Sequence, residues 1–140
     1  GKRMSVIVDT SIWSLALRRD GGEGEAFVKE LEELIVEIRA QLIGPIRQEL
    51  LSGIRSEEQY MVLKSHLRAF KDLPLKTTDF ELAAEFFNTA RKTGIQGSHT
   101  DFLICAVSSR NRMPVFTADK DFVKLQSVLS VALHKIRTYR

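Results

Sequence analysis

The chain has 140 residues, of which 44% are hydrophobic and 28% are charged, as in an ordinary globular protein with one hydrophobic core. Its single cysteine, Cys105, excludes an internal disulfide and a zinc site of several cysteines, and favours a reducing, cytoplasmic setting. The net charge of +3 suits a polyanionic partner without establishing one, and no apolar run is long enough to span a membrane.

The first half of the chain predicts two short buried strands and four helices. The strands are expected at 5–9 and 41–44, where apolar residues follow one another without polar alternation. Apolar residues at helical spacing predict helices over 10–19, 25–39, 45–54 and 56–70. Thr10 and Ser11 are expected to cap the first of these helices, and Pro45 suits a first helical position. Residues 1–3 precede Met4 and are expected to be left over from cloning, so one domain is predicted over 4–140.

The second half continues the alternation of strands and helices. A short extended piece is expected at 73–75 and a helix over 79–92, capped by Thr78. A polar loop at 94–98 precedes a helix over 99–110, a strand at 115–117, a helix over 119–125 and a last strand at 131–136. Because strands alternate with helices, we predict one α/β domain whose mainly parallel sheet is covered on both faces.

Four segments far apart in the chain each place an acidic residue where a strand ends or a helix begins. They contain Asp9, Glu49, Asp101 and the neighbours Asp119 and Asp121. Taken singly, each acid has an ordinary explanation as a helix cap, a charge in a first helical turn or a solvated side chain. Because the carboxyl ends of parallel strands converge on one crevice, we expect these segments to meet there. Two carboxylates ~5 Å apart repel by roughly 3 kcal/mol at an effective dielectric of ~20, so the cluster predicts a divalent-metal site.

The order of these segments resembles that of a known family. Val8-Asp9-Thr10-Ser11 is followed by Gly-Pro-x-x-x-Glu-Leu-Leu-x-Gly over 44–53, then by Asp101 at the start of an apolar helix and by Thr-x-Asp-x-Asp-Phe over 117–122. This order is similar to that of the PIN-domain nucleases, and more narrowly of the VapC toxin ribonucleases of type II toxin–antitoxin modules. The resemblance runs from Met4 to the last strand and implies a three-layer α/β/α sandwich.

The resemblance implies catalytic roles for all five acids. Asp9 and Asp101 are expected to bind the metal directly, with Glu49 and Asp119 bound through water or to a second ion. Asp121 is the alternative, or an addition, to Asp119. Mg²⁺ is the expected cation, with Mn²⁺ as a substitute, since both take oxygen ligands. The resemblance also implies that hydroxyl groups support the site, and these belong to Thr10, Ser11 and Thr117.

The same resemblance implies a substrate and partners. The substrate is single-stranded or loop RNA, cut to leave a 5′ phosphate and a 3′ hydroxyl. The protein partner is a VapB-type antitoxin, in a hetero-oligomer, and the toxin itself is expected to form a homodimer. Apolar helical residues also favour a dimer if they remain exposed, whereas one core could bury them all; they are Leu15, Phe27, Leu31, Phe86 and Phe87.

Other interpretations remain open at this stage. A housekeeping RNA-processing nuclease of the same fold needs no antitoxin, and an RNA-binding scaffold needs no catalysis. A receiver domain of two-component signalling also has an acidic Mg²⁺ pocket, but it requires a pair of acids after its first strand, where this chain has Asp9 alone. His99 is either a base, a substrate contact or a structural histidine. Basic residues flank the acidic segments and suit either phosphates or solvated helix ends: Arg18, Arg19, Arg110, Arg112, Lys120 and Lys124.

Overall fold

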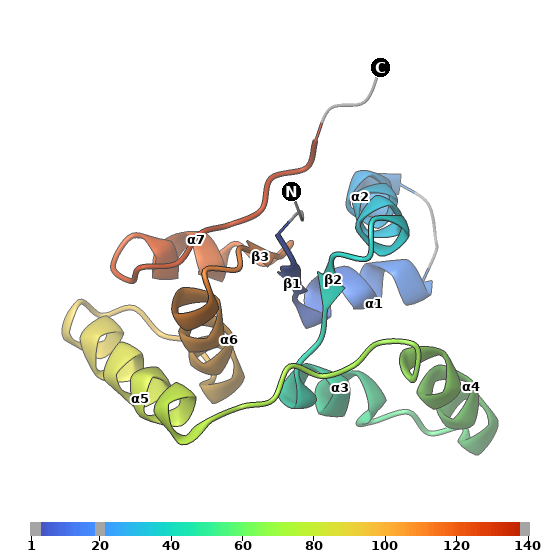
Figure 1. Ribbon diagram of the computed structural model, residues 1–140, viewed down its shortest axis with the longest axis horizontal. Helices are drawn as coiled ribbons and strands as arrows, with labels where there is room; N and C mark the ends of the chain where they lie inside the picture. The colour runs from blue at the N-terminus through green and yellow to red at the C-terminus, as the bar shows by residue number, and fades with distance from the viewer. Residues whose placement is uncertain (1–3, 19–21, 138–140) are drawn as a thin grey trace.

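Three short parallel strands lie at the centre of the computed structural model, which describes residues 4–18 and 22–137 (Figure 1). They are β1 (Val6–Val8), β2 (Ala40–Gln41) and β3 (Val115–Phe116), in the spatial order β2-β1-β3. All three residues of β1 are fully buried, as expected of a central strand that is covered on both faces. The expected cloning residues 1–3 lie outside the described part of the chain.

Helices flank the sheet on both sides (Figure 1). In chain order they are α1 (Thr10–Arg18), the short turn η1 (Gly22–Gly24), α2 (Glu25–Val36), α3 (Gly44–Leu51), α4 (Glu57–Leu67), α5 (Thr77–Lys92), α6 (His99–Asn111) and α7 (Asp121–Gln126). The α2 helix reaches the sheet through Phe27, whose ring lies 6.0 Å from that of Phe116 in β3. On the other side α6 packs against β3, and α5 packs along α6. The predicted α/β class with a parallel sheet is confirmed.

Two of the predicted strands differ from the observed ones. The second strand occupies Ala40–Gln41 rather than 41–44, because Gly44 already begins α3. Over 131–136 the described chain makes one isolated bridge, between Leu133 and Val115, instead of a strand. Likewise the extended piece expected at 73–75 is represented by one bridge between Asp72 and Leu42. The hydrophobic pattern of the sequence locates extended apolar segments, but it does not show how many backbone hydrogen bonds each will form with a neighbouring strand.

Helix ends account for most of the remaining differences. The helix predicted over 25–39 ends at Val36, because Ile38 takes a left-handed conformation with φ of 57° and the Arg39 N–H turns back to the Leu34 carbonyl. The predicted cap at Thr78 is wrong, since α5 begins at Thr77 after the N-cap Lys76. Ser56 is an N-cap whose hydroxyl accepts a hydrogen bond from the Gln59 N–H.

Apolar residues from every layer meet around the sheet. Trp13 and Cys105 are buried, and the Trp13 indole donates a hydrogen bond to the Val8 carbonyl. Leu31 is only 2% exposed and belongs to the core, so it is not one of the apolar residues left exposed for a dimer interface. Phe27, Phe86 and Phe87 are partly buried against the same core. Within the described ranges no helix is both long and apolar enough to cross a membrane.

Candidate active site

Asp9 stands at the carboxyl end of β1, where the chain turns into α1. Its backbone N–H donates to the Phe116 carbonyl, which continues the pairing of β1 with β3. The carboxylate is 6% exposed, and its Oδ2 accepts hydrogen bonds from the hydroxyls of Ser11 and Thr117, each at 2.8 Å. The strand end and two hydroxyls from opposite parts of the chain therefore fix this carboxylate in place.

The segment after β3 is held against α1 by the same hydroxyls. Ser11 Oγ accepts the Ala118 N–H at 3.0 Å, and Thr117 Oγ1 accepts the Asp119 N–H at 2.9 Å. Asp119 in turn accepts the Asp121 N–H through Oδ1 at 2.9 Å, which starts α7. This chain of hydrogen bonds places Asp119 beside the end of β1. The Asp119 carboxylate forms no ion pair with a basic residue that the structure describes.

Asp101 reaches the same region from the first turn of α6. Its Oδ2 accepts the Ser98 N–H, and its own N–H donates to Ser98 Oγ, which together form a capping box. Burial raises the pKa of the Asp101 carboxyl; the Ser98 hydrogen bonds oppose the rise, and the charges of Asp9 and Asp119 add to it. Burial, together with Asp101 and Asp9, also raises the pKa of the neighbouring Cys105 thiol to about 12, so this thiol stays protonated near neutral pH.

Glu49 approaches from α3. Desolvation raises the pKa of its carboxyl, and the nearby charges of Asp9 and Asp101 raise it further. The nearby Thr10 hydroxyl acts to lower the pKa of Glu49. This buried oxygen makes no hydrogen bond to any group among the described residues. Glu49 and Thr10 line a cleft of about 380 Å³, together with Pro45, Gln48, Ser52 and Thr100.

Asp9, Glu49, Asp101 and Asp119, here called the acidic cluster, thus interact electrostatically although they come from four separate segments. In the part of the chain that the structure describes, no Lys, Arg or His forms a salt bridge with any of them. Asp121 lies outside the cluster: its side chain is 55% exposed and faces Lys124 at 4.0 Å. Mutual repulsion without a basic partner is the condition that a bound cation relieves.

The acidic cluster offers the oxygen ligands that a hard cation prefers, but its side chains do not surround a single ion position. Over residues 4–18 and 22–137, no three Asp, Glu, His or Cys side chains are close enough to bind one ion together. Mg²⁺ retains several waters and needs only one or two direct carboxylates, so the donor set remains compatible with it. Thr10, which lines the cleft, adds a buried hydroxyl without a hydrogen-bond partner among the described residues.

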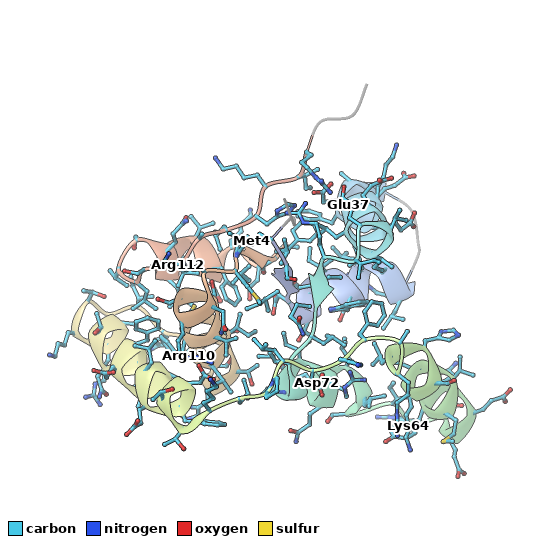
Figure 2. The ribbon with its side chains drawn as sticks, viewed as in Figure 1. Met4, Glu37, Lys64, Asp72, Arg110 and Arg112 are labelled. Carbon is cyan, nitrogen blue, oxygen red and sulfur yellow. The ribbon has the colours of Figure 1, made fainter. Side chains whose placement is uncertain are left out.

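Several other candidates lie elsewhere. Arg110, labelled between α5 and α6 in Figure 2, donates two hydrogen bonds to Asp79, so of its two open interpretations neither a phosphate contact nor a solvated helix end describes it. His99 stacks on Phe87 and lines a separate hollow. Arg19 lies outside the described residues. Ser98, which positions Asp101, was not among the expected site residues, although Ser-x-x-Asp before an apolar helix is a capping-box signature.

Comparison with known proteins gives a family and a fold. The PIN domain profile matches residues 6–127. The structure is similar to FitAcB from Neisseria gonorrhoeae (TM-score 0.74, 23% identity, 93% of this chain and 96% of that one). It is also similar to DNA-bound VapBC from Salmonella typhimurium (0.75, 12%, 94% and 98%) and to VapBC2 from Rickettsia felis bound to a promoter fragment (0.73, 16%, 94% and 98%). No curated protein sequence matches the chain.

Proposed function

Because the chain belongs to the PIN domain family, we propose that it is a metal-dependent endoribonuclease, and more narrowly the toxin of a type II toxin–antitoxin module. The observation that carries the proposal is the acidic cluster, in which four carboxylates from separate segments interact electrostatically without a basic partner among the described residues, with Glu49 lining the cleft. Membership of the PIN domain family excludes the alternative of a receiver domain. An RNA-binding scaffold would have no need of these mutually repelling charges.

Hydrolysis of a phosphodiester requires an activated water and stabilisation of the charge that develops on the phosphate oxygens. Asp9 and Asp101 would hold a divalent cation directly, with Glu49 and Asp119 bound through water, and the cation would supply Lewis acidity and lower the pKa of bound water. Ser11 and Thr117 hold the Asp9 carboxylate by Oδ2, and Ser98 holds that of Asp101. These side chains preorganise the site, so little rearrangement is needed when substrate binds.

The cation proposed for the site is Mg²⁺, with Mn²⁺ as a substitute. Both prefer the carboxylate and water oxygens that the acidic cluster offers. The proposed substrate is single-stranded or loop RNA, whose phosphates would meet exposed basic side chains near the cleft. Lys120 and Lys124, one and five residues after Asp119 in the sequence, are exposed and suit that contact.

A partner protein is part of the proposal. The similar structures from Salmonella typhimurium and Rickettsia felis contain VapBC complexes, which supports a VapB-type antitoxin for this chain as well. A basic side chain of the antitoxin entering the acidic cluster would neutralise it and compete with the cation. A homodimer, and a hetero-oligomer with the antitoxin, complete the assembly that we propose. Light scattering at micromolar concentration measures the dimer directly, and a monomer mass would contradict it.

Cleavage of RNA by the purified chain tests the enzyme. We expect the wild type to cut single-stranded RNA in Mg²⁺ or Mn²⁺ and to stop in excess EDTA. Asp9→Asn should reduce cleavage at least ~100-fold, a loss of about 3 kcal/mol of transition-state stabilisation, while leaving the protein folded. Glu58→Gln, at an exposed position on α4 outside the cluster, is a matched control and should retain most activity. Full activity of Asp9→Asn, or cleavage that persists in EDTA, would refute the proposal.

Expression in a bacterium distinguishes the toxin from a housekeeping RNA-processing nuclease of the same fold. Production of the wild-type chain alone should arrest growth, and the inactive Asp9→Asn protein should not. Co-expression of the neighbouring gene should restore growth if that gene encodes the antitoxin. Harmless expression of an active wild-type chain would favour the housekeeping nuclease.

A further inference from the structure

A second hollow lies next to the cleft that Glu49 lines. It has a volume of about 490 Å³, within the usual range of small-ligand pockets, and lies between α5 and α6. Its walls include Pro45 and Thr100, which also line the cleft that contains Glu49. The hollow and the cleft therefore adjoin, and a ligand that fills one lies within reach of the other.

The α5 wall of this hollow is one face of the helix. Phe80, Ala83, Ala84, Phe87 and Asn88 follow one another at spacings of three, four, seven and eight residues from the first, so they stand on the same side. Phe80 is 54% exposed although it is a large apolar residue. This face of α5 thus leaves aromatic surface open beside the acidic cluster.

Aromatic rings and polar groups are combined in the walls. The Phe87 and His99 rings are nearly parallel, with centroids 5.7 Å apart and planes inclined by 19°. Asn88, His99 and Thr100 bring an amide, an imidazole and a hydroxyl to the same hollow. Flat apolar walls with a few hydrogen-bonding groups are what a nucleobase requires, since every base has a π-face and a polar edge.

Beyond Phe87 the surface continues toward a cation. Phe87 and Phe102 also line a neighbouring hollow that contains Arg91, Gln96 and Gly97. The Arg91 guanidinium lies 5.8 Å from the centre of the Phe87 ring. The order along the surface is therefore acidic cluster, aromatic hollow and guanidinium, which matches the order of scissile phosphate, unstacked base and next phosphate in a single strand.

We propose that the hollow between α5 and α6 is a nucleobase pocket, which binds one unstacked base of the RNA adjacent to the cut phosphate. The proposal rests on the proposed ribonuclease function and adds to it the contact that positions the strand. The base packs against Phe80 and the Phe87–His99 ring pair, and its polar edge is read by Asn88. The Arg91 guanidinium attracts the phosphate on the far side of that base.

Cleavage of matched substrates tests the pocket. A single-stranded RNA oligonucleotide that the wild type cuts at one mapped position is compared with versions carrying an abasic residue at each flanking position. With wild-type protein, one abasic version should lower kcat/KM about 10-fold or more, since stacking of a base contributes on that scale. Phe80→Ser should cause a similar loss on the intact oligonucleotide but less than about 2-fold on that abasic version. Asn88→Ala provides a second variant at an exposed position and should behave in the same way.

Met61→Ser is the matched control, because Met61 on α4 is also 54% exposed but lies outside the hollow. It should leave all rates unchanged. Equal losses for Phe80→Ser on intact and abasic oligonucleotides would overturn the pocket. So would a change from dimer to monomer in light scattering on Phe80→Ser, because a second copy of the chain would then cover the hollow. Absence of any RNA cleavage by the wild type would overturn the proposed function itself, and the pocket with it.

Discussion

Asp79 and Asp101 occupy the same local position in two neighbouring helices but have opposite electrostatic surroundings. Each is the third residue of its helix, α5 or α6, and each carboxylate accepts the N–H of the residue before the helix. Burial acts to raise the pKa of Asp79, but hydrogen bonds from Arg110 and the Lys76 N–H outweigh it and lower this pKa. The pKa of Asp101 is raised, because burial and the charges of Asp9 and Asp119 outweigh the Ser98 hydrogen bonds.

A second buried acid belongs with Asp79. Glu30 in α2 has no exposed surface, and its Oε2 lies 2.6 Å from His134 Nε2 and 2.8 Å from Arg137 Nε. These contacts attach the segment after α7 to α2. Glu30 and Asp79 therefore have structural roles, because the basic side chains paired with them offset the free-energy cost of burying their charges.

The comparison separates two kinds of acid that look alike in the sequence. An acid with a basic partner is accounted for by folding alone. The acidic cluster lacks such a partner among the described residues, so its folded state carries a repulsion that folding does not require. Like charges that repel one another and lower the stability of the folded protein are typical of a functional site when they lie at a cleft. We expect substitutions in the two groups to have opposite effects on stability.

The largest effect is expected from Asp79→Asn. The amide keeps the shape and can still accept the Lys76 N–H, but it removes the charge that faces Arg110. The free energy of unfolding should fall by about 1.5–3 kcal/mol, the scale of a hydrogen bond to a charged group. Urea denaturation followed by circular dichroism measures the change. Wild-type stability in this variant would mean that the ion pair between α5 and α6 contributes nothing.

A smaller effect of opposite sign is expected from Asp101→Asn without metal. The same substitution at the same helical position relieves repulsion by Asp9 and Asp119, and the amide oxygen can still accept the Ser98 N–H. The free energy of unfolding should stay unchanged or rise by up to about 1 kcal/mol, as for other partly exposed charge pairs. A loss as large as that for Asp79→Asn would remove the distinction between the two acids.

The smallest effect is expected in how pH changes the stability differences between the wild type and these two variants. The folded pKa of Asp101 lies above its ordinary value of 3.8, so the stability of the metal-free wild type relative to Asp101→Asn decreases as pH rises through that folded pKa. The folded pKa of Asp79 lies below 3.8, so the advantage of the wild type over Asp79→Asn is present at neutral pH and decreases as pH falls through it. Denaturation series between about pH 2 and 7 should show the two trends in opposite directions, with that of Asp79 below about pH 4. Parallel trends would contradict the assignment of partners.

The sequence predicted most of the fold because its strands and helices have strong local signals. The β1 run Val6-Ile7-Val8 and the apolar face of α6 are clear in the chain itself. The end of α2 was missed because Ile38 takes a left-handed conformation that its side chain does not favour. The bridge at Leu133 replaced a predicted strand because pairing depends on a neighbour distant in the chain.

The acids of the site were indicated by their positions after strands and at helix starts, but their partners were not. Arg110 and Asp79 are 31 residues apart, and no spacing in the sequence indicates that the two will pair. The sequence therefore left Arg110 open between a phosphate contact and a solvated helix end, and only the packing of α5 against α6 distinguishes a paired acid from one in the cluster. Ser98 was within reach of sequence reasoning, because the capping box that it forms with Asp101 is local.

Thermal unfolding in a Mg²⁺ titration tests the central claim most directly, namely that the acidic cluster is a cation site. The wild type and Asp79→Asn should both gain about 1.4 kcal/mol when the free Mg²⁺ concentration is ten times the dissociation constant. Asp101→Asn should gain far less at the same concentration, because a proposed direct ligand has lost its charge. An equal gain in all three proteins, or none in the wild type, would contradict the account.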